Sequence, residues 1–233
     1  MDKFLCELKV GTRSQVKKEL KQGFVKVNGE TVTEPERKVD VEKDQVVYKG
    51  RTLSYRKYAY YMLNKPAGVV SATKDNTCLT VAELLKDTGC GGLFPVGRLD
   101  KDTEGLLIMT NDGSLAHRLL SPRKHVDKVY EAELEEELSK EAVKDLESGV
   151  DIGEDRPTLP AKVELFGGNR IRLTITEGKF HQVKRMMRAV GNGVVSLRRT
   201  SMGGLMLDES LRPGEYRELS EEEITVLQKG GMP

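Results

Sequence analysis

The most constraining stretch of this 233-residue chain is a charged loop that runs directly into an apolar segment. Residues 97–104 hold three carboxylates and two cations, and the apolar run 106–109 follows at once. Such a run predicts a buried strand, so the charged side chains stand at the end of a sheet, where rigid scaffolds often carry functional loops. The alternative is a solvated turn with surface ion pairs, which are common and weak.

The composition is typical of a globular protein, with 37% hydrophobic and 32% charged residues. No apolar run approaches the roughly 20 residues that span a bilayer. The N-terminal residues are charged almost at once and lack an apolar signal region. We therefore expect a cytoplasmic protein without a membrane partner.

Cysteine and histidine spacing gives no sign of a metal site. Cys6, Cys78 and Cys90 are far apart and form no CxxC pair, and the three histidines show no ligand spacing. Neither a disulfide framework nor a bound metal is expected.

Charge is distributed unevenly along the chain. Residues 1–57 contain 14 Lys and Arg against 9 Asp and Glu, a net of +5, whereas the remainder has 24 against 28, a net of −4. A basic module joined to a mildly acidic body is typical of proteins that bind an anionic polymer, although an excess of five charges can also arise by chance.

The N-terminal pattern predicts two short helices and a small sheet. Apolar spacing favours helix over 3–22, broken near Gly11, with Thr12 or Ser14 as the cap of the second helix. That helix carries Arg13, Lys17, Lys18 and Lys21. Asn28-Gly29 predicts a tight hairpin, and residues 39–48 suggest another extended pair with Asp44 in its turn. A basic helix followed by Gly-Phe-Val-Lys-Val-Asn-Gly resembles the S4-type RNA-binding domain.

The remainder mixes strands and helices. Strands are expected at 60–64, 69–72, 105–110, 129–134, 162–166 and 170–176, and helices at 80–85, from Ser114, at 139–149 and at 180–190. The last helix has an apolar stripe, while its polar side carries His181, Lys184, Arg185 and Arg188. No acid lies between Glu177 and Asp208, so positive potential concentrates at one sheet edge. Lys184 is a candidate partner for Asp100.

Four motifs, in this order, resemble pseudouridine synthases of the RsuA/RluB/RluE/RluF family. They are Asn-Lys-Pro-Ala-Gly at 64–68, Gly-Arg-Leu-Asp-Lys-Asp-Thr-Glu-Gly-Leu-Leu at 97–107, Lys-Val-Tyr-Glu at 128–131 and Glu-Gly-Lys-Phe-His-Gln-Val-Lys-Arg-Met at 177–186. The resemblance implies an α+β protein with an S4-like RNA-binding domain at 1–57 and a pseudouridine synthase catalytic domain at 58–233. The catalytic domain would have a mixed, largely antiparallel sheet and a central cleft.

The resemblance also implies roles for individual residues. Asp100 is the expected essential carboxylate, as a nucleophile or as a base on the sugar; Tyr130 would stack on the flipped uracil and Lys184 would keep Asp100 ionised. Asp102 and Glu104 are expected to brace the loop through backbone hydrogen bonds. Lys65 and Arg98 are candidates for phosphate or loop-fixing contacts. The full expected RNA-contact set is Arg13, Lys17, Lys18, Lys21, Lys65, Arg98, Lys179, His181, Gln182, Arg185 and Arg188.

The expected function is isomerisation of a uridine in ribosomal RNA by a monomer that needs no cofactor. The sequence His-Gln-Val-Lys at residues 181–184, near the start of the last helix, resembles the RsuA branch and so favours a 16S rRNA target. A 23S rRNA enzyme of the RluB/RluE/RluF branch and a non-catalytic rRNA assembly factor are the alternatives. A glycoside hydrolase is disfavoured because Asp100 and Asp102 are too close in sequence to flank a sugar.

Overall fold

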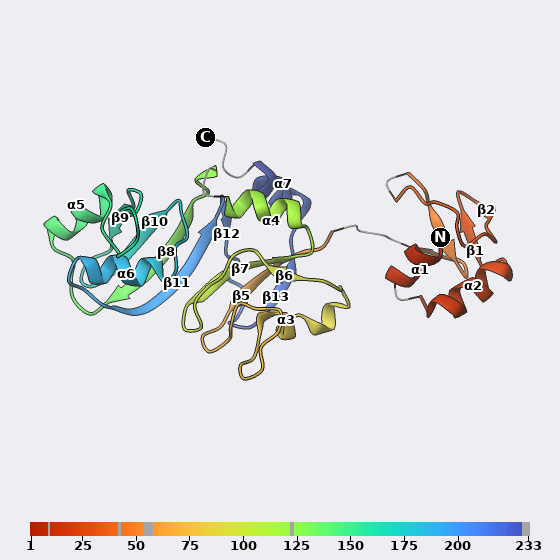
Figure 1. The fold of residues 1–233 in the computed structure, drawn as a ribbon, viewed down its shortest axis with the longest axis horizontal. Helices are drawn as coiled ribbons and strands as arrows, with labels where there is room; N and C mark the ends of the chain where they lie inside the picture. Colours follow the sequence, from red (N-terminus) through yellow and green to blue (C-terminus); the bar gives the residue numbers. More distant parts are fainter. Residues whose placement is uncertain (9, 42, 54–57, 122–123, 230–233) are drawn as a thin grey trace. The chain divides into compact units, whose positions relative to one another are not determined.

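The computed structural model describes residues 1–8, 10–41, 43–53, 58–121 and 124–229. The chain divides into two compact units, Met1–Lys57 and Tyr58–Pro233. Each unit has its own sheet and hydrophobic core (Figure 1).

The first unit packs two helices against a four-stranded antiparallel sheet. The helices are α1 (Asp2–Glu7) and α2 (Arg13–Lys21), and the sheet order is β2 (Glu30–Thr31), β1 (Val25–Val27), β3 (Val46–Tyr48), β4 (Arg51–Leu53). Thr12 caps α2, and the Gln15 side chain completes the capping box. Asn28 and Gly29 have φ of 51° and 88°, so the predicted hairpin is confirmed.

The extended pair predicted within residues 39–48 is wrong. The strands are β3 and β4, and their turn is Lys49-Gly50, with φ of 46° and 79°. Asp44 precedes β3, and its carboxylate accepts hydrogen bonds from Asn28 Nδ2 and the Asp40 amide. A lysine at positive φ is uncommon, so the sequence around Lys49 carries little turn signal.

The second unit is built on a nine-stranded sheet in the order β13-β5-β7-β11-β8-β10-β9, with β6 on β7 and β12 on β11. Its strands are β5 (Tyr60–Lys65), β6 (Phe94–Pro95), β7 (Glu104–Thr110), β8 (Lys128–Leu134), β9 (Lys162–Leu165), β10 (Arg170–Ile175), β11 (Val194–Met202), β12 (Leu205–Met206) and β13 (Tyr216–Glu218). Among the described strands only β7 and β11 pair in parallel. The predicted mixed, largely antiparallel sheet is therefore confirmed.

The helices of this unit cover two apolar clusters. They are α3 (Val81–Leu84), the 3₁₀ turn η1 (Lys86–Thr88), α4 (Gly113–Leu120), α5 (Lys140–Ser148), α6 (Gln182–Ala189) and α7 (Glu221–Lys229). Figure 1 shows α5 and α6 beside β8–β10, and α4 and α7 together at the other half of the sheet. Residues such as Leu146 and Met186 fill the first cluster, and Leu115 and Leu227 fill the second.

Three local predictions need correction. Asp112, not Ser114, caps α4, because its carboxylate accepts the amides of Ser114 and Leu115. Residues 69–72 form only an isolated bridge between Val70 and Thr80. Helix α6 begins at Gln182, two residues later than predicted, because His181 adopts a left-handed conformation with φ of 48°.

Gly105 permits the parallel contact at the centre of the sheet. It pairs with Arg199 of β11 and has φ of 98°. A Cβ atom at this position would lie 2.2 Å from the Arg199 carbonyl oxygen. Only glycine therefore allows β11 to lie this close to the end of the charged loop.

The charged loop is held by a buried lysine. Lys65 ends β5 with no exposed surface, and its Nζ donates to the carbonyls of Pro66, Lys101 and Thr103 at 3.0, 3.2 and 2.8 Å. Ser71 supports the same loop, since its hydroxyl donates to the Leu99 carbonyl and accepts the Leu99 amide. These contacts agree with loop fixing, one of the two roles predicted for Lys65, whereas they do not support a phosphate contact, because backbone carbonyls use all three ammonium hydrogens.

No helix within the described ranges is long and apolar enough to cross a membrane. In the same part of the chain, no group of three or more His, Cys, Asp or Glu side chains is arranged to hold a metal ion.

Replacing Lys65 with methionine is expected to lower the free energy of unfolding by about 2–4 kcal/mol, because three buried carbonyls lose their donor. Lys74→Met, at an exposed position, is the control and should stay within about 0.5 kcal/mol of the wild type. Urea denaturation of the three proteins measures the difference. Equal stability of Lys65→Met and the wild type would contradict the anchoring role.

Stability is also expected to rise between pH 8 and 9.5. Burial lowers the pKa of Lys65 to about 8, and burial with the neighbouring Arg199 does the same for Lys128. The unfolded lysines titrate near 10.4, so in this window the unfolded state binds more protons and the free energy of unfolding increases with pH, by up to about 1.4 kcal/mol per pH unit for each lysine. Denaturation at pH 7.5, 8.5 and 9.5 measures this slope, and a flat or falling profile would contradict it.

Candidate active site

Asp100 lies in a pocket of about 110 Å³ beside the parallel contact of β7 and β11. The loop before β7, strands β8, β10 and β11, and the start of α6 contribute its walls. Its lining includes charged, polar and aromatic residues, among them Arg98, Asp100, Thr103, Lys128, Tyr130, His181 and Arg199. Residues from distant parts of the sequence therefore converge on the carboxylate that the charged loop supplies.

The Asp100 carboxylate is partly buried and lies between two nitrogen groups. Its side chain is 23% exposed, with Oδ2 3.6 Å from Lys184 Nζ and Oδ1 3.5 Å from His181 Nε2. Lys184 is similarly shielded, at 22% exposure. Each carboxylate oxygen of Asp100 therefore faces one nitrogen group.

Lys184 also binds Asp102, and this contact is the shorter one. Lys184 Nζ lies 2.5 Å from Asp102 Oδ1, and this hydrogen bond lowers the pKa of the Asp102 carboxyl below its usual range. The side chain of Asp102 is 73% exposed. The Asp102 carboxylate thus contacts Lys184 and also accepts its own backbone amide, while Lys65 and Ser71 hold the rest of the loop.

Tyr130 reaches the pocket because β8 alternates. Its inward positions are Lys128, Tyr130, Ala132 and Leu134, and these four residues are buried. Tyr130 pairs with Leu173 of β10 and Arg199 of β11. This inward face of β8 thus delivers an aromatic ring to the pocket that holds Asp100.

The turn before α6 is rigid. Gln182 is buried, its Oε1 accepts the Lys179 amide and its Nε2 donates to Glu177 Oε1. Both ends of the Gln182 amide are used inside the chain, but the residue also lines the pocket, so its RNA contact stays a prediction. His181, with its positive φ, stacks on the exposed ring of Phe180 at a centroid distance of 3.8 Å.

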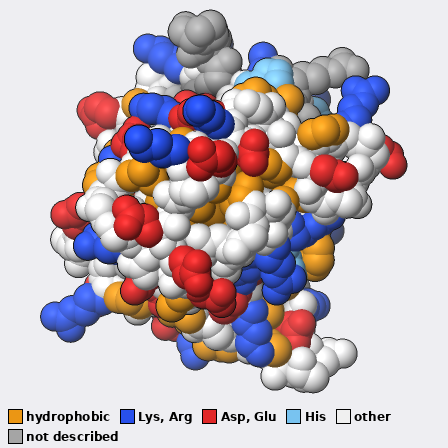
Figure 2. Space-filling view, turned by 90° about the vertical axis from the view of Figure 1, so that its left-hand side faces the viewer, with side chains coloured by type: hydrophobic (Ala, Val, Ile, Leu, Met, Phe, Trp, Pro, Cys, Tyr) orange, Lys and Arg blue, Asp and Glu red, His pale blue; other side chains and the backbone are white. Residues whose placement is uncertain are grey.

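The other cations predicted to contact RNA fall into two groups. Lys179 donates to the carbonyls of Arg156 and Pro157, and Arg185 binds Glu154 and the carbonyls of Phe180 and Ile152. Arg98 and Arg188 are exposed. Figure 2 views the end of the molecule near α5, β9 and β10, and shows acidic and basic side chains interspersed rather than one basic field.

The four cations predicted on the first unit lie on one short helix. Arg13, Lys17, Lys18 and Lys21 are exposed on α2. Arg13 Nε also pairs with Asp2 at 3.1 Å. The three lysines form a cationic surface, which we call the α2 lysine cluster.

Three buried polar residues of the pocket were not predicted as site residues. Lys128 shares the inward face of Tyr130, and the strand alternation was a signal that could have identified it. Thr103 and Arg199 gave no comparable signal, because β11 was not predicted and its pairing with Gly105 depends on the tertiary fold.

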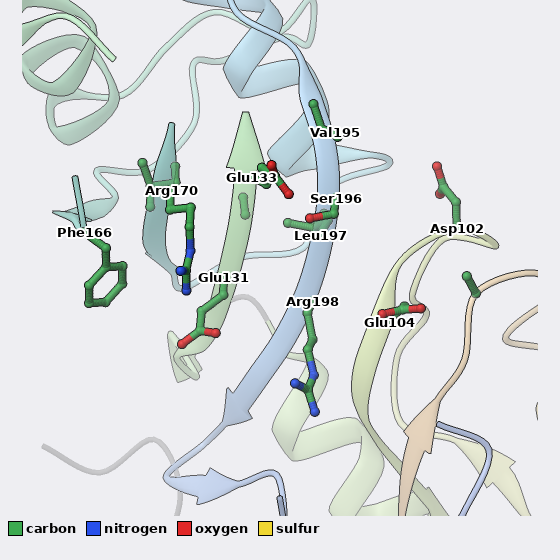
Figure 3. Close-up of a pocket in the computed structure, with 13 residues that line it drawn as sticks. Asp102, Glu104, Glu131, Glu133, Phe166, Arg170, Val195, Ser196, Leu197 and Arg198 are labelled. Carbon is green, nitrogen blue, oxygen red and sulfur yellow. The ribbon is translucent and has the colours of Figure 1, made fainter. Parts of the chain in front are cut away.

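A second pocket, of about 420 Å³, lies beside the same strands but has a different character. Glu104, Glu131, Glu133 and Arg198 line it, and Figure 3 shows Arg198 between Glu131 on β8 and Glu104 on β7. Glu104, predicted to brace the loop, thus lines this pocket. Asp100 and Tyr130 belong to the first pocket.

Comparison with known proteins agrees with this geometry. The family described as RNA pseudouridylate synthase matches residues 59–189, and the S4 domain matches residues 1–46. The chain is 50% identical to an uncharacterized RNA pseudouridine synthase, YtzG, of Bacillus subtilis over 232 residues, covering 97% of each chain. It is 42% identical to ribosomal small subunit pseudouridine synthase A of Escherichia coli over 226 residues, covering 96% and 97% of the two chains.

A solved structure gives the same answer. A crystal structure titled pseudouridylate synthase superimposes with a TM-score of 0.70 at 40% identity, covering 97% of this chain and 98% of the other. The sequence matches, the shared fold and the convergence of the four motifs at the charged loop lead to one conclusion. This chain belongs to the RsuA family of RNA pseudouridine synthases and carries an N-terminal S4 domain.

Proposed function

We propose that this protein isomerises one uridine of 16S ribosomal RNA to pseudouridine. The observation that carries the catalytic assignment is the partly buried Asp100 carboxylate, paired with Lys184 in the pocket that Tyr130 lines. The names of the relatives from Escherichia coli and Haemophilus influenzae, 42% and 40% identical, support a small-subunit target.

The proposed reaction needs an ionised carboxylate next to the sugar. The N1–C1′ bond of uridine breaks, the base turns, and a C5–C1′ bond forms, so every atom of the nucleotide is kept and we propose no cofactor. Asp100 acts at the sugar, either as a nucleophile on C1′ or as a base. Lys184 keeps it ionised and positioned.

Tyr130 is the proposed contact for the base. A uridine has to leave its stack before an enzyme can reach the glycosidic bond. The buried ring of Tyr130, fixed by the pairing of β8 with β10 and β11, offers a flat apolar surface for the flipped uracil.

The S4 unit is the proposed docking module for the RNA backbone. The α2 lysine cluster presents Lys17, Lys18 and Lys21 on an exposed helix. Lysines that neutralise phosphates release counterions, which makes the affinity salt-dependent. This unit would hold the substrate while the second unit acts on the uridine.

Asp100→Asn is expected to bind rRNA with an affinity within about threefold of the wild type but to form no pseudouridine, because an amide cannot replace the carboxylate at the sugar. Carbodiimide-probed primer extension measures the product, and filter binding measures the affinity. Asp102→Asn is the comparison, and it should retain activity within about tenfold because its carboxylate is exposed and only holds Lys184. Product from purified Asp100→Asn above background would refute the assignment.

Changing all three lysines of the α2 lysine cluster to glutamine in the full chain is expected to weaken RNA binding. The slope of log affinity against log salt concentration should decrease by roughly 0.7–0.9 for each lost phosphate contact. The matched control changes Lys86, Lys140 and Lys144, which are exposed on the second unit. An identical slope for the cluster variant and the wild type would contradict the docking role.

A further inference from the structure

Two buried side-chain atoms of the described residues have no hydrogen-bond partner, and both belong to the Asp100 pocket. They are Thr103 Oγ1 and Arg199 Nη2, on residues that are 1% and 2% exposed. Native proteins rarely leave buried polar groups unpaired, and each exception calls for an explanation. Because both unpaired atoms lie in one pocket, they point to a polar ligand that forms hydrogen bonds with both.

Arg199 is fixed in place by the strands around it. Its Nε donates to the Leu106 carbonyl at 2.9 Å, and its backbone lies against Gly105, where no side chain fits. The guanidinium is thereby held before any substrate arrives. A donor that is already oriented stabilises charge in the transition state without reorganisation.

The same wall of the pocket carries a second buried cation. Lys128 is 7% exposed, and its Nζ donates to the Val126 carbonyl at 2.9 Å. Among the described residues, neither Lys128 nor Arg199 forms an ion pair with a carboxylate, whereas Lys184 and His181 face Asp100. Asp127 and Glu177 act on Lys128 only through longer-range electrostatics. Two buried cations that lack an ion-paired carboxylate favour an electron-rich ligand.

The proposed reaction creates such a group. When the N1–C1′ bond breaks, its electron pair stays on uracil, and the negative charge is shared by N1, O2 and O4. The new C5–C1′ bond then forms, C5 loses its proton and N1 gains one. Both roles left open for Asp100 place this charge on the detached base.

We propose that Arg199 is a further catalytic residue, whose Nη2–H donates to a carbonyl oxygen of the flipped uracil, and that the Thr103 hydroxyl contacts the same base. This inference rests on the proposed function. The contact strengthens as charge develops on O2 or O4, so Arg199 stabilises the departing base while Asp100 acts at the sugar. A phosphate oxygen as the partner of Arg199 is the competing explanation, and the experiment below separates the two.

The test pairs a protein change with a single-atom change in the substrate. Short rRNA substrates carry uridine, 2-thiouridine or 4-thiouridine at the target position, since sulfur is a poor acceptor. Single-turnover rates at saturating RNA are measured for the wild type, Arg199→Lys and Arg198→Lys. Lysine keeps the charge but lacks Nη2, and Arg198 is the matched control because it is exposed and lines the other pocket (Figure 3).

The wild type and Arg198→Lys should be slowed equally, by about 10- to 100-fold, on one of the two thio substrates. Arg199→Lys should be slowed by a similar factor on uridine and should lose nothing further on that thio substrate, because the contact is already absent. If sulfur slows Arg199→Lys and the wild type by the same factor relative to uridine, the proposal is overturned. A contact of Arg199 with a phosphate oxygen predicts that result.

Thr103→Val provides a second cycle that preserves side-chain volume. Its rate on uridine should fall by about 3- to 10-fold, with a smaller sulfur penalty than the wild type on at least one thio substrate. Thermal unfolding of each variant verifies the fold. If the wild type makes no pseudouridine from uridine, the proposed function and this inference fail together. If the wild type is active but sulfur slows it and Arg199→Lys by the same factor, only the inference fails.

Discussion

The interaction on which the rest of the site depends is the buried ammonium of Lys65. One nitrogen joins the carbonyls of Pro66, Lys101 and Thr103, and so links the end of β5 to the charged loop before β7. Burying an ammonium is costly unless its donors are satisfied, and these three carbonyls satisfy them. The backbone of the loop is therefore held while the Asp100 side chain projects into the pocket, and a reacting carboxylate requires such a fixed position.

The pocket is organised by a division of charge. Asp100 is flanked by Lys184 and His181, and the exposed Asp102 holds Lys184 from the other side. The buried cations Lys128 and Arg199 form a different wall and lack a carboxylate partner among the described residues. In the proposed reaction, the first wall positions the carboxylate that acts at the sugar, and the second wall would meet the negative charge on the detached base. The glycine at 105 makes this arrangement possible, because it lets β11 approach the loop.

Sequence reasoning succeeded where local patterns decide the structure. The Asn28-Gly29 hairpin follows from its turn residues, and the existence of strand β8 and the apolar stripe of α6 follow from short-range sequence patterns. It failed where tertiary contacts decide the structure. The Lys49-Gly50 turn has a lysine at positive φ. The burial of Lys65 and Gln182 was not predicted, because the partners of Lys65 include carbonyls distant in sequence and those of Gln182 lie in a turn. Arg199 escaped notice for the same reason, since its burial depends on the pairing of β11 with β7 and β8.

The proposed substrate is 16S rRNA. The most direct measurement is carbodiimide-probed primer extension across both rRNAs from a strain in which the gene is deleted, with the wild-type gene restored as the control. If 16S rRNA is the substrate, one reverse-transcription stop disappears from it in the deletion strain and returns with the restored gene. An unchanged 16S pattern, or a missing stop in 23S rRNA instead, would contradict it.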